Sequence, residues 1–501
     1  MSRFVLSQTS VVSALDDLAN QKEITVFVGA GSSEQAGLPT WNTLVEHLLV
    51  RVGSLQGLSD DDAIEFADWT IKSEGLMGSA AIAEDALGPD FELELGKALY
   101  GERKKLVPGE IADAVARLWV NCADSDLEIV TTNYDLTLED ALKFELKKHP
   151  KLKGLSPVSL HDGRPAPDDK LVVRHLHGVL PPTGKKIGEV ILTEGSYQQM
   201  QNSPCWQEEY FSKRLQTSSC LFVGTSLSDP NILRYLYRAK GDLGRKHYAV
   251  FVRQQDAEMY VELDENICDV REDMSSKRWE NIGVSPIRLD YFAESAQFLH
   301  ELALKKKNPS AAPFEERMEF LDGLRTRYEF SEAIEVFVPN QDQKQELLAR
   351  IVDAISSELQ EEGCPLGRGE RLGCSLWRYD SARNQLINWF SSDRSWRNPS
   401  TLEPVEIKWH SDFVSVIAFC KGSWTSYSSA QQSATRWNHI IGLPLFSDGE
   451  ELGRLPLGVI TIGSTESESH SALARGTSIL APYIRTLMPI CSEALGAERK
   501  I

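Results

Sequence analysis

The sequence predicts an α/β fold, with a parallel sheet covered by helices on both faces, followed by an α+β region. Short apolar runs rich in β-branched residues recur through the first part of the chain, several of them separated by helical stretches. A charged and then Pro/Ala-rich segment follows at residues 305–313. Beyond it, apolar and polar residues alternate in short runs, which is typical of antiparallel strands.

The first part of the chain alternates between predicted strands and helices. The helical patterns cover 11–18, 41–100 and 136–146. The predicted strands are 24–28, 127–130, 171–173, 190–192, 220–223, 248–252 and 286–289. Such alternation indicates a parallel sheet, because the chain needs a crossover to begin each new parallel strand.

The second part has a different pattern, with one long helix ahead of several alternating strands. The amphipathic helix is expected over 343–360, the strands at 374–379, 385–390, 415–419, 439–445 and 457–462, and a terminal helix at 479–494. The first two of these strands are spaced to form an antiparallel hairpin. We therefore expect a domain over 1–305, a linker over 306–313 and an α+β domain over 314–501.

Composition excludes some classes of partner. The formal net charge of −20 argues against a broad surface for nucleic acid or anionic lipid, since either requires basic side chains. No apolar run approaches the roughly 20 residues that span a bilayer, and Met1-Ser2-Arg3-Phe4 does not begin a signal peptide. The eight cysteines include no Cys-x-x-Cys pair, so no zinc or other metal site is expected. We expect a cytoplasmic protein without membrane or nucleic-acid partners.

Four polar turns follow predicted strands at the edge where open parallel sheets bind ligands. They contain Gly29, Ala30, Gly31, Ser32 and Ser33 in the first turn, Thr132, Asn133 and Asp135 in the second, His177 and Gly178 in the third, and Gly224, Thr225 and Ser226 in the fourth. Glycines allow backbone N–H groups to approach a pyrophosphate, hydroxyls suit ribose or phosphate, and an imidazole can accept a proton. Each turn alone also has a structural explanation, as a tight turn, a helix cap or a space-filling histidine. Their convergence on one edge favours a nucleotide site.

In these motifs the chain resembles the sirtuin family, and more closely the sirtuin-like NADases of bacterial anti-phage defence, over roughly residues 10–300. Gly29-Ala30-Gly31-Ser32 is similar to the family's phosphate loop, and Thr131-Thr132-Asn133-Tyr134-Asp135 to its Thr-Gln-Asn-x-Asp segment. His177-Gly178 matches the catalytic His-Gly, and Gly224-Thr225-Ser226 the later nucleotide-binding turn. The resemblance implies a Rossmann-like domain that cleaves NAD at the nicotinamide–ribose bond.

The resemblance also implies roles for individual side chains. Asn133 is expected to hold the ribose or the attacking water, Asp135 to orient the nicotinamide–ribose end, and His177 to act as general base. Deacylating sirtuins carry a zinc module built from two Cys-x-x-Cys pairs, which this sequence lacks, and Thr132 stands where they usually have Gln. These departures favour NAD hydrolysis over lysine deacylation.

Residues 314–501 resemble, more weakly, a GAF-type sensor domain in their strand order. A freely active NADase would deplete its own cell, so we expect this part to sense a trigger or to bind a defence partner, and we expect a homo-oligomer as in defence relatives. Two alternatives stay open. One is an ADP-ribosyltransferase or deacylase that consumes NAD as co-substrate, and the other is a non-enzymatic module that senses NAD or ADP-ribose.

Overall fold

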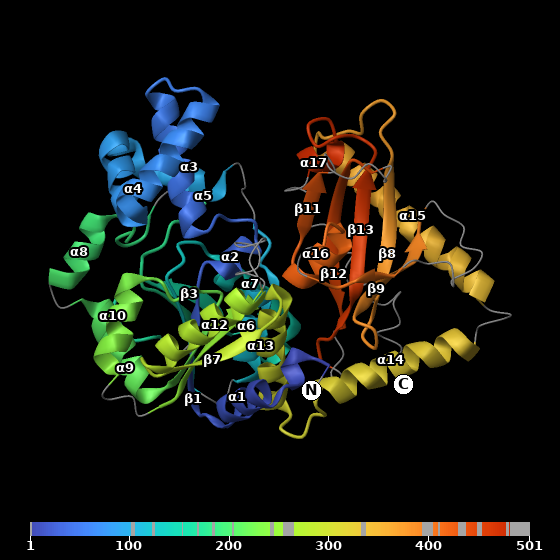
Figure 1. Cartoon of the computed structure of the whole chain (residues 1–501), viewed down its shortest axis with the longest axis horizontal. Helices are drawn as coiled ribbons and strands as arrows, with labels where there is room; N and C mark the ends of the chain where they lie inside the picture. Colours follow the sequence, from blue (N-terminus) through green and yellow to red (C-terminus); the bar gives the residue numbers. More distant parts are fainter. Residues whose placement is uncertain are drawn as a thin grey trace. The chain divides into compact units, whose positions relative to one another are not determined.

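The structure is a computed structural model whose described residues form two compact units (Figure 1). It describes residues 3–101, 106–122, 126–152, 154–167, 170–182, 186–202, 205–240, 245–253, 265–331, 337–392, 404–408, 411–428, 437–447, 453–476 and 480. The first unit comprises residues 13–251 and 264–288, and the second comprises residues 1–12, 252–263 and 289–501. Neither unit is a continuous stretch of sequence. The predicted domain boundaries at 305 and 314 stay a prediction.

A seven-stranded sheet forms the centre of the first unit, in the order β3-β4-β2-β1-β5-β6-β7. The strands are β1 (Glu23–Val28), β2 (Asp126–Thr131), β3 (Ser156–Leu160), β4 (Lys170–His175), β5 (Ser219–Val223), β6 (His247–Val252) and β7 (Val284–Leu289). The pairs β1–β2, β1–β5, β2–β4, β3–β4 and β5–β6 are parallel. Helices flank this sheet, so the predicted α/β, Rossmann-like fold class is confirmed.

The helices of this part of the chain connect the strands or add to them. The α-helices are α1 (Thr9–Asn20), α2 (Gly31–Glu34), α3 (Trp41–Leu55), α4 (Asp60–Leu87), α5 (Phe91–Tyr100), α6 (Glu110–Asn121), α7 (Thr137–Lys148), α8 (Glu194–Asn202), α9 (Trp206–Thr217), α10 (Pro230–Ala239) and α12 (Glu265–Glu280). Single 3-10 turns occur at η1 (Val5–Ser7), η2 (Gly88–Asp90) and η3 (Pro150–Leu152). Phe27 of β1 and Phe222 of β5 pack ring to ring at 5.3 Å under Phe211 of α9. Burial of such strands explains their continuous apolar sequences.

Two local expectations for the first part differ from the structure. The strand predicted at 190–192 is wrong, because this segment is an irregular connection in which the Ile191 N–H donates to the His177 carbonyl. Ile191 and Leu192 are buried all the same, and Ile191 packs against Tyr197 and Met200. β3 was not predicted, since Ser-Pro-Val-Ser-Leu lies at the edge of the sheet, is only half-buried and contains Pro157.

The second unit contains a six-stranded sheet in the order β10-β9-β8-β13-β12-β11, and each of its strand pairs is antiparallel. Its strands are β8 (Leu372–Asp380), β9 (Gln385–Ser391), β10 (Val405–Glu406), β11 (Thr425–Ser428), β12 (His439–Phe446) and β13 (Pro456–Ser464). Its helices are α13 (Phe292–Lys307), α14 (Phe314–Ser331), α15 (Phe337–Glu361), α16 (Val414–Lys421) and α17 (Ala472–Arg475). The predicted hairpin is confirmed by the pairing of β8 with β9.

The strand predicted at 415–419 is wrong, because these residues form helix α16. A short apolar run fits a buried helix as well as a buried strand, and periodicity does not separate the two. Gly422 ends the helix in a left-handed conformation (φ 64°), where its N–H donates to the Ala418 carbonyl. The terminal helix predicted at 479–494 lies outside the described residues, except for position 480.

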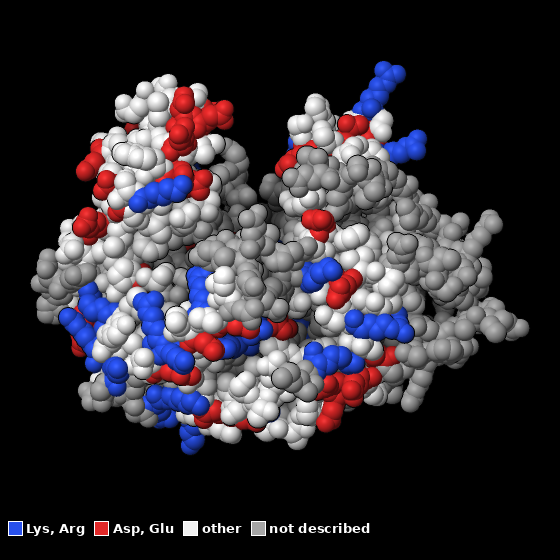
Figure 2. Space-filling model, in the orientation of Figure 1, with Lys and Arg blue, Asp and Glu red and all other residues white. Residues whose placement is uncertain are grey.

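Charged side chains are mixed on the face of the molecule in Figure 2. Lys and Arg lie beside Asp and Glu over much of the coloured surface, and several acidic side chains cover the region of α3 to α5, where α4 begins Asp60-Asp61-Asp62. The three aspartates lie in the first turn of α4, where negative charge opposes the helix dipole favourably. Within the described part of the chain, no helix combines the length and the hydropathy needed to cross a bilayer.

Candidate functional site

Four loops meet at one edge of the parallel sheet. β1 lies in the middle of the sheet between β2 and β5, and β4 lies beyond β2. Because these strands are parallel, the loops that follow them all start from the same edge. The chain crosses from one half of the sheet to the other beside β1, which is the position where open α/β sheets form a ligand-binding crevice.

The glycines of the first loop allow it to touch the loop after β5. The Gly29 N–H donates to the Val223 carbonyl at 3.0 Å, and the Gly31 N–H donates to the Gly224 carbonyl at 2.8 Å. A Cβ on Gly29 would lie 2.5 Å from the Gly224 oxygen, and Gly224 itself has a positive φ of 62°. Close backbone contact between two loops therefore requires these glycines. Ala30 precedes the single turn of α2.

Asn133 joins the second loop to the first. Its Nδ2 donates to the Gly29 carbonyl at 3.0 Å and contacts the hydroxyls of Ser32 at 3.2 Å and Ser33 at 2.8 Å. Its backbone N–H donates to Oγ1 of Thr131 at 3.0 Å. The side chain is buried, and its Oδ1 accepts no hydrogen bond from any described residue. The amide nitrogen is therefore committed to the protein, while the amide oxygen stays available.

The Asp135 carboxylate joins Ser33 of the first loop to the start of α7. Oδ2 accepts a hydrogen bond from the Ser33 hydroxyl at 2.5 Å. Oδ1 accepts from the Thr137 N–H at 2.9 Å and from the Thr137 hydroxyl at 2.5 Å. Thr137 is the first residue of α7, so this carboxylate fixes the start of that helix and the position of Ser33 together.

His177 occupies a buried, partly aromatic setting next to a carboxylate. Its Nε2 lies 3.7 Å from Oδ2 of Asp229, too far for a hydrogen bond, and finds no hydrogen-bond partner in the described structure. Tyr197 packs edge-on against the imidazole at 5.7 Å and donates its hydroxyl to Asp229 at 2.7 Å. Burial lowers the pKa of His177 below its ordinary value, and Asp229 opposes this shift. The ring is therefore neutral at pH 7 and can accept a proton.

A buried ion pair supports the turn that carries Asn133. Nε2 of His175 lies 2.9 Å from Oε1 of Glu139, and Nδ1 lies 2.8 Å from the Asn133 carbonyl. Burial lowers the pKa of His175, but the Glu139 charge and hydrogen bond reverse this and hold it above its ordinary value. Burial likewise raises the pKa of Glu139, but His175 and Ser159 hold it below its ordinary value. Each side chain therefore stabilises the charged form of the other, and together they fix the backbone of Asn133.

The remaining predicted site residues lie on the same four loops. Thr132 is half-buried, Thr225 accepts the Leu227 N–H at 3.1 Å, and Ser226 is exposed, with its hydroxyl 2.7 Å from that of Ser228. Contacts join all four loops: the first touches the second through Asn133 and the fourth through Gly224, while the third reaches the fourth through His177. The Leu180 N–H, just past Gly178, donates to the Tyr134 carbonyl and joins the third loop to the second.

Sequence reasoning missed three contributors to this site. Asp229 lies three residues beyond Ser226, where an Asp before Pro230 is a common helix start, and its Oδ1 accepts the Asn231 and Ile232 N–H groups. Tyr197 and Glu139 give no local signal. They lie on helices α8 and α7, and only the tertiary fold brings them to their partners Asp229 and His175.

One family model matches part of this chain. The model described as "SIR2-like domain" matches residues 127–287, from β2 into β7, so this part of the chain is similar to that family. The match includes three of the four loops and leaves the glycine loop after β1 outside. No curated protein matches the sequence.

Solved structures of Sir2 proteins are similar to this chain at low identity. One, described as "Structural Basis for the Mechanism and Regulation of Sir2 Enzymes", is 14% identical, covers 60% of this chain and 98% of its own, and has a TM-score of 0.32. Another, described as "Crystal structure of a Sir2 homolog–NAD complex", is 13% identical, covers 60% of this chain and 94% of its own, and also has a TM-score of 0.32. Among the described residues of the present structure, no group of three or more His, Cys, Asp or Glu side chains is arranged to hold a metal ion.

Replacing Gly29 by Ala should destabilise the protein, because the new Cβ collides with the Gly224 oxygen and with Thr225. We expect a loss of about 1–3 kcal/mol in the free energy of unfolding, measured by urea denaturation. Gly195→Ala is the matched control, since a Cβ at Gly195 in α8 meets no atom within 4 Å. Equal stability of the two variants would contradict the proposed close contact of the loops.

Replacing Glu139 by Gln should destabilise the protein by about 3–5 kcal/mol, because it leaves the buried His175 without its counter-charge. Because the pKa of His175 is raised, this residue stabilises the fold at pH values below its ordinary pKa of 6.5. Because the pKa of Glu139 is lowered, this residue stabilises the fold at pH values above its ordinary pKa of 4.5. The loss in the free energy of unfolding should therefore be largest between pH 4.5 and 6.5. Asp140→Asn on the same helix, which breaks a half-exposed pair with Lys143, should cost less than about 1 kcal/mol. Urea denaturation across this pH range tests both, and a similar effect of the two substitutions would contradict the buried ion pair.

Proposed function

We propose that the SIR2-like domain binds NAD and hydrolyses its nicotinamide–ribose bond to give ADP-ribose and nicotinamide. The observation that carries the proposal is that two groups suited to this chemistry lie on adjacent loops. One is the fixed amide of Asn133, whose Oδ1 has no hydrogen-bond partner in the described structure, and the other is the neutral imidazole of His177, beside the Asp229 carboxylate. The match of residues 127–287 to the SIR2-like domain supports it. The Gly224-Thr225-Ser226 turn supplies hydroxyls for the pyrophosphate and ribose. The glycine loop, whose Gly29 and Gly31 N–H groups already donate to the loop after β5, lets the ligand approach its backbone closely.

In this proposal the chain's own groups position the reactants and move one proton. The bond between the ribose and the nicotinamide nitrogen breaks, the bonding electrons leave with neutral nicotinamide, and the ribose carbon gains cationic character. Oδ1 of Asn133 accepts a hydrogen bond from the attacking water or a ribose hydroxyl. His177 takes the proton that the water releases as its oxygen bonds to the ribose carbon. Asp135 keeps Ser33 and Asn133 in place around the sugar.

The proposal extends to a role in anti-phage defence, in which NAD depletion stops the infected cell. Unregulated NAD hydrolysis would harm the host, so we propose that the C-terminal part acts as a GAF-like regulatory domain and that the protein works as a homo-oligomer in the cytoplasm. Cellular NAD, measured with and without phage challenge, tests the role. An equal NAD level under both conditions, with the full-length protein expressed, would exclude it.

Asn133→Ala and His177→Ala should each lower NAD turnover by about 10²- to 10⁴-fold, because each removes one of the groups that position or deprotonate the nucleophile. Turnover is measured by release of free ADP-ribose and nicotinamide. Hydrolysis predicts equal amounts of the two products, whereas transfer leaves ADP-ribose on an acceptor.

His247→Ala is the matched control for the histidine variant. His247 is also a fully buried imidazole, on β6, where its Nδ1 accepts the Cys220 N–H at 3.1 Å. The His247→Ala substitution should affect the stability of the protein, but NAD turnover per folded molecule should stay close to that of the unmodified protein. Near-normal turnover in His177→Ala, or an equal loss in His247→Ala with both proteins folded, would refute the proposed role of His177.

The pH profile gives a separate test of His177 as general base. Because its pKa lies below the ordinary 6.5, kcat/KM should fall only as the pH drops below that value. Asp229→Asn removes the negative charge that opposes this shift but keeps a cap on α10, so the acid limb should move to lower pH by about one unit. An unchanged acid limb in Asp229→Asn, or a shift of this limb to higher pH, would show that a group other than His177 controls the fall of kcat/KM at low pH.

A further inference from the structure

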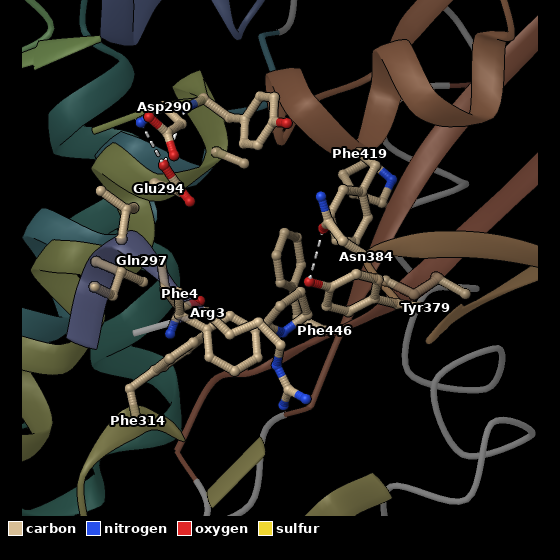
Figure 3. A pocket seen from close by; sticks show the side chains of 17 residues that line it. Arg3, Phe4, Asp290, Glu294, Gln297, Phe314, Tyr379, Asn384, Phe419 and Phe446 are labelled. Carbon is tan, nitrogen blue, oxygen red and sulfur yellow. Dashed lines mark hydrogen bonds between the residues drawn. The ribbon is translucent and has the colours of Figure 1, made fainter. Parts of the chain in front are cut away.

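A cavity of about 120 Å³ lies within the second unit (Figure 3). Its seventeen lining residues come from the N-terminal segment, the start of α13 and α14, β8 and the turn after it, α16, and strands β12 and β13. All of these belong to the second unit, so the cavity is separate from the nucleotide site proposed above. Nothing in the NAD mechanism uses it.

Aromatic rings form much of the wall of this cavity. Phe4 and Phe314 pack edge to face at 5.3 Å on one side, and Tyr379 and Phe419 pack at 4.7 Å on the other (Figure 3). Phe446 of β12 adds a fifth ring. Walls of this kind favour a flat, apolar ligand surface. An apolar cavity of about 150 Å³ accepts one benzene molecule, and the present volume is somewhat smaller, so it has room for no more than a single ring.

One end of the cavity is polar, because the Glu294 carboxyl reaches it from the first turn of α13. Oε2 of Glu294 accepts the N–H groups of Asp290 at 2.7 Å and Tyr291 at 3.0 Å, which caps the helix. Oε1 receives no hydrogen bond within the described structure. Burial first, and then the neighbouring Asp290 carboxyl, raises the pKa of Glu294 to about 8. The carboxyl is therefore mostly protonated at neutral pH and can both donate and accept.

Arginine side chains already cover several of the ring faces. The guanidinium of Arg3 lies 4.7 Å from the Phe4 ring centre, that of Arg454 lies 4.6 Å from Phe446, and that of Arg317 lies 5.8 Å from Phe314. These positions satisfy the attraction of the rings for positive charge and add positive charge close to the cavity. An organic cation is therefore disfavoured as the ligand, although aromatic rings and carboxyls together would otherwise suit one.

We propose that this cavity binds a small, neutral, single-ring heteroaromatic molecule with an amide-type edge, the chemistry shared by pyrimidine bases and pyridine carboxamides. The ring lies between the Phe4–Phe314 and Tyr379–Phe419 pairs, and its amide edge exchanges hydrogen bonds with Glu294. The site does not depend on NAD cleavage. It gives the second unit a ligand of its own.

Calorimetric titration of the full-length protein with uracil and with nicotinamide tests the proposal and separates the two ligand sources. Binding of either one is expected, and it should persist in Asn133→Ala, which places it outside the nucleotide site. Phe419→Ala should weaken it at least about five-fold by removing one wall. Glu294→Met should weaken it roughly five- to ten-fold by removing the polar partner.

Tyr379→Phe is the matched control, because it removes only a hydroxyl that bonds to Asn384 at 3.3 Å and keeps the ring. Its affinity should equal that of the unmodified protein. If Phe419→Ala does not fold, the affinity of Glu294→Met and the relative affinities of other ligands still test the proposal. No binding of either probe, unchanged affinity in Glu294→Met, or tighter binding of toluene, benzylammonium or adenine would overturn the assignment.

Discussion

The close contact between the loops after β1 and β5 is the constraint on which the site depends. β1 is hydrogen-bonded on both sides, to β2 and β5, so the loop leaving it has no free flank and must pass directly against its neighbours. Two backbones can approach this closely only where no Cβ intervenes, and Gly29, Gly31 and Gly224 meet that condition. The same glycines that suggest phosphate binding in the sequence therefore have a packing role first. The N–H groups of Gly29 and Gly31 donate to Val223 and Gly224 in this contact, so they hold the two loops together rather than pointing at a ligand.

Burial then separates the groups that support the site from those left available for a ligand. Buried polar atoms are nearly always paired, so an unpaired one needs a reason. The carboxylate of Asp135 and the imidazole of His175 are fully occupied by neighbours, and their effect is to position other residues. Oδ1 of Asn133 and Nε2 of His177 are left without partners in the described structure. In the proposed NAD hydrolysis, these two atoms are the points of contact for the sugar and the attacking water.

Much of the first unit's sheet follows from its sequence, because strands buried on both faces require continuous apolar runs. The runs that became β1, β2, β4, β5 and β6 have this character, whereas the two edge strands, β3 and β7, are less buried and contain Pro157 and Pro286. The run at 415–419 is equally apolar but folds as α16, since only tertiary packing decides whether such a run forms a buried strand or a buried helix. The loops of the site could be located because glycine, Asn and His directly follow strands. The roles of Glu139 and Tyr197 could not be located, because each lies within a helix and meets its partner, His175 or Asp229, only in the tertiary fold.

The order of segments along the chain ties the two units together covalently. Residues 1–12 and 289–307 belong to the second unit, although they directly precede and follow segments of the first. The carboxyl of Glu294 therefore stands only five residues beyond Leu289, the last residue of β7. The start of α13 thus continues directly from the backbone of the parallel sheet. Removing everything after residue 313 would leave α13 and residues 1–12 without the sheet of their unit, so the two parts are best studied in one chain.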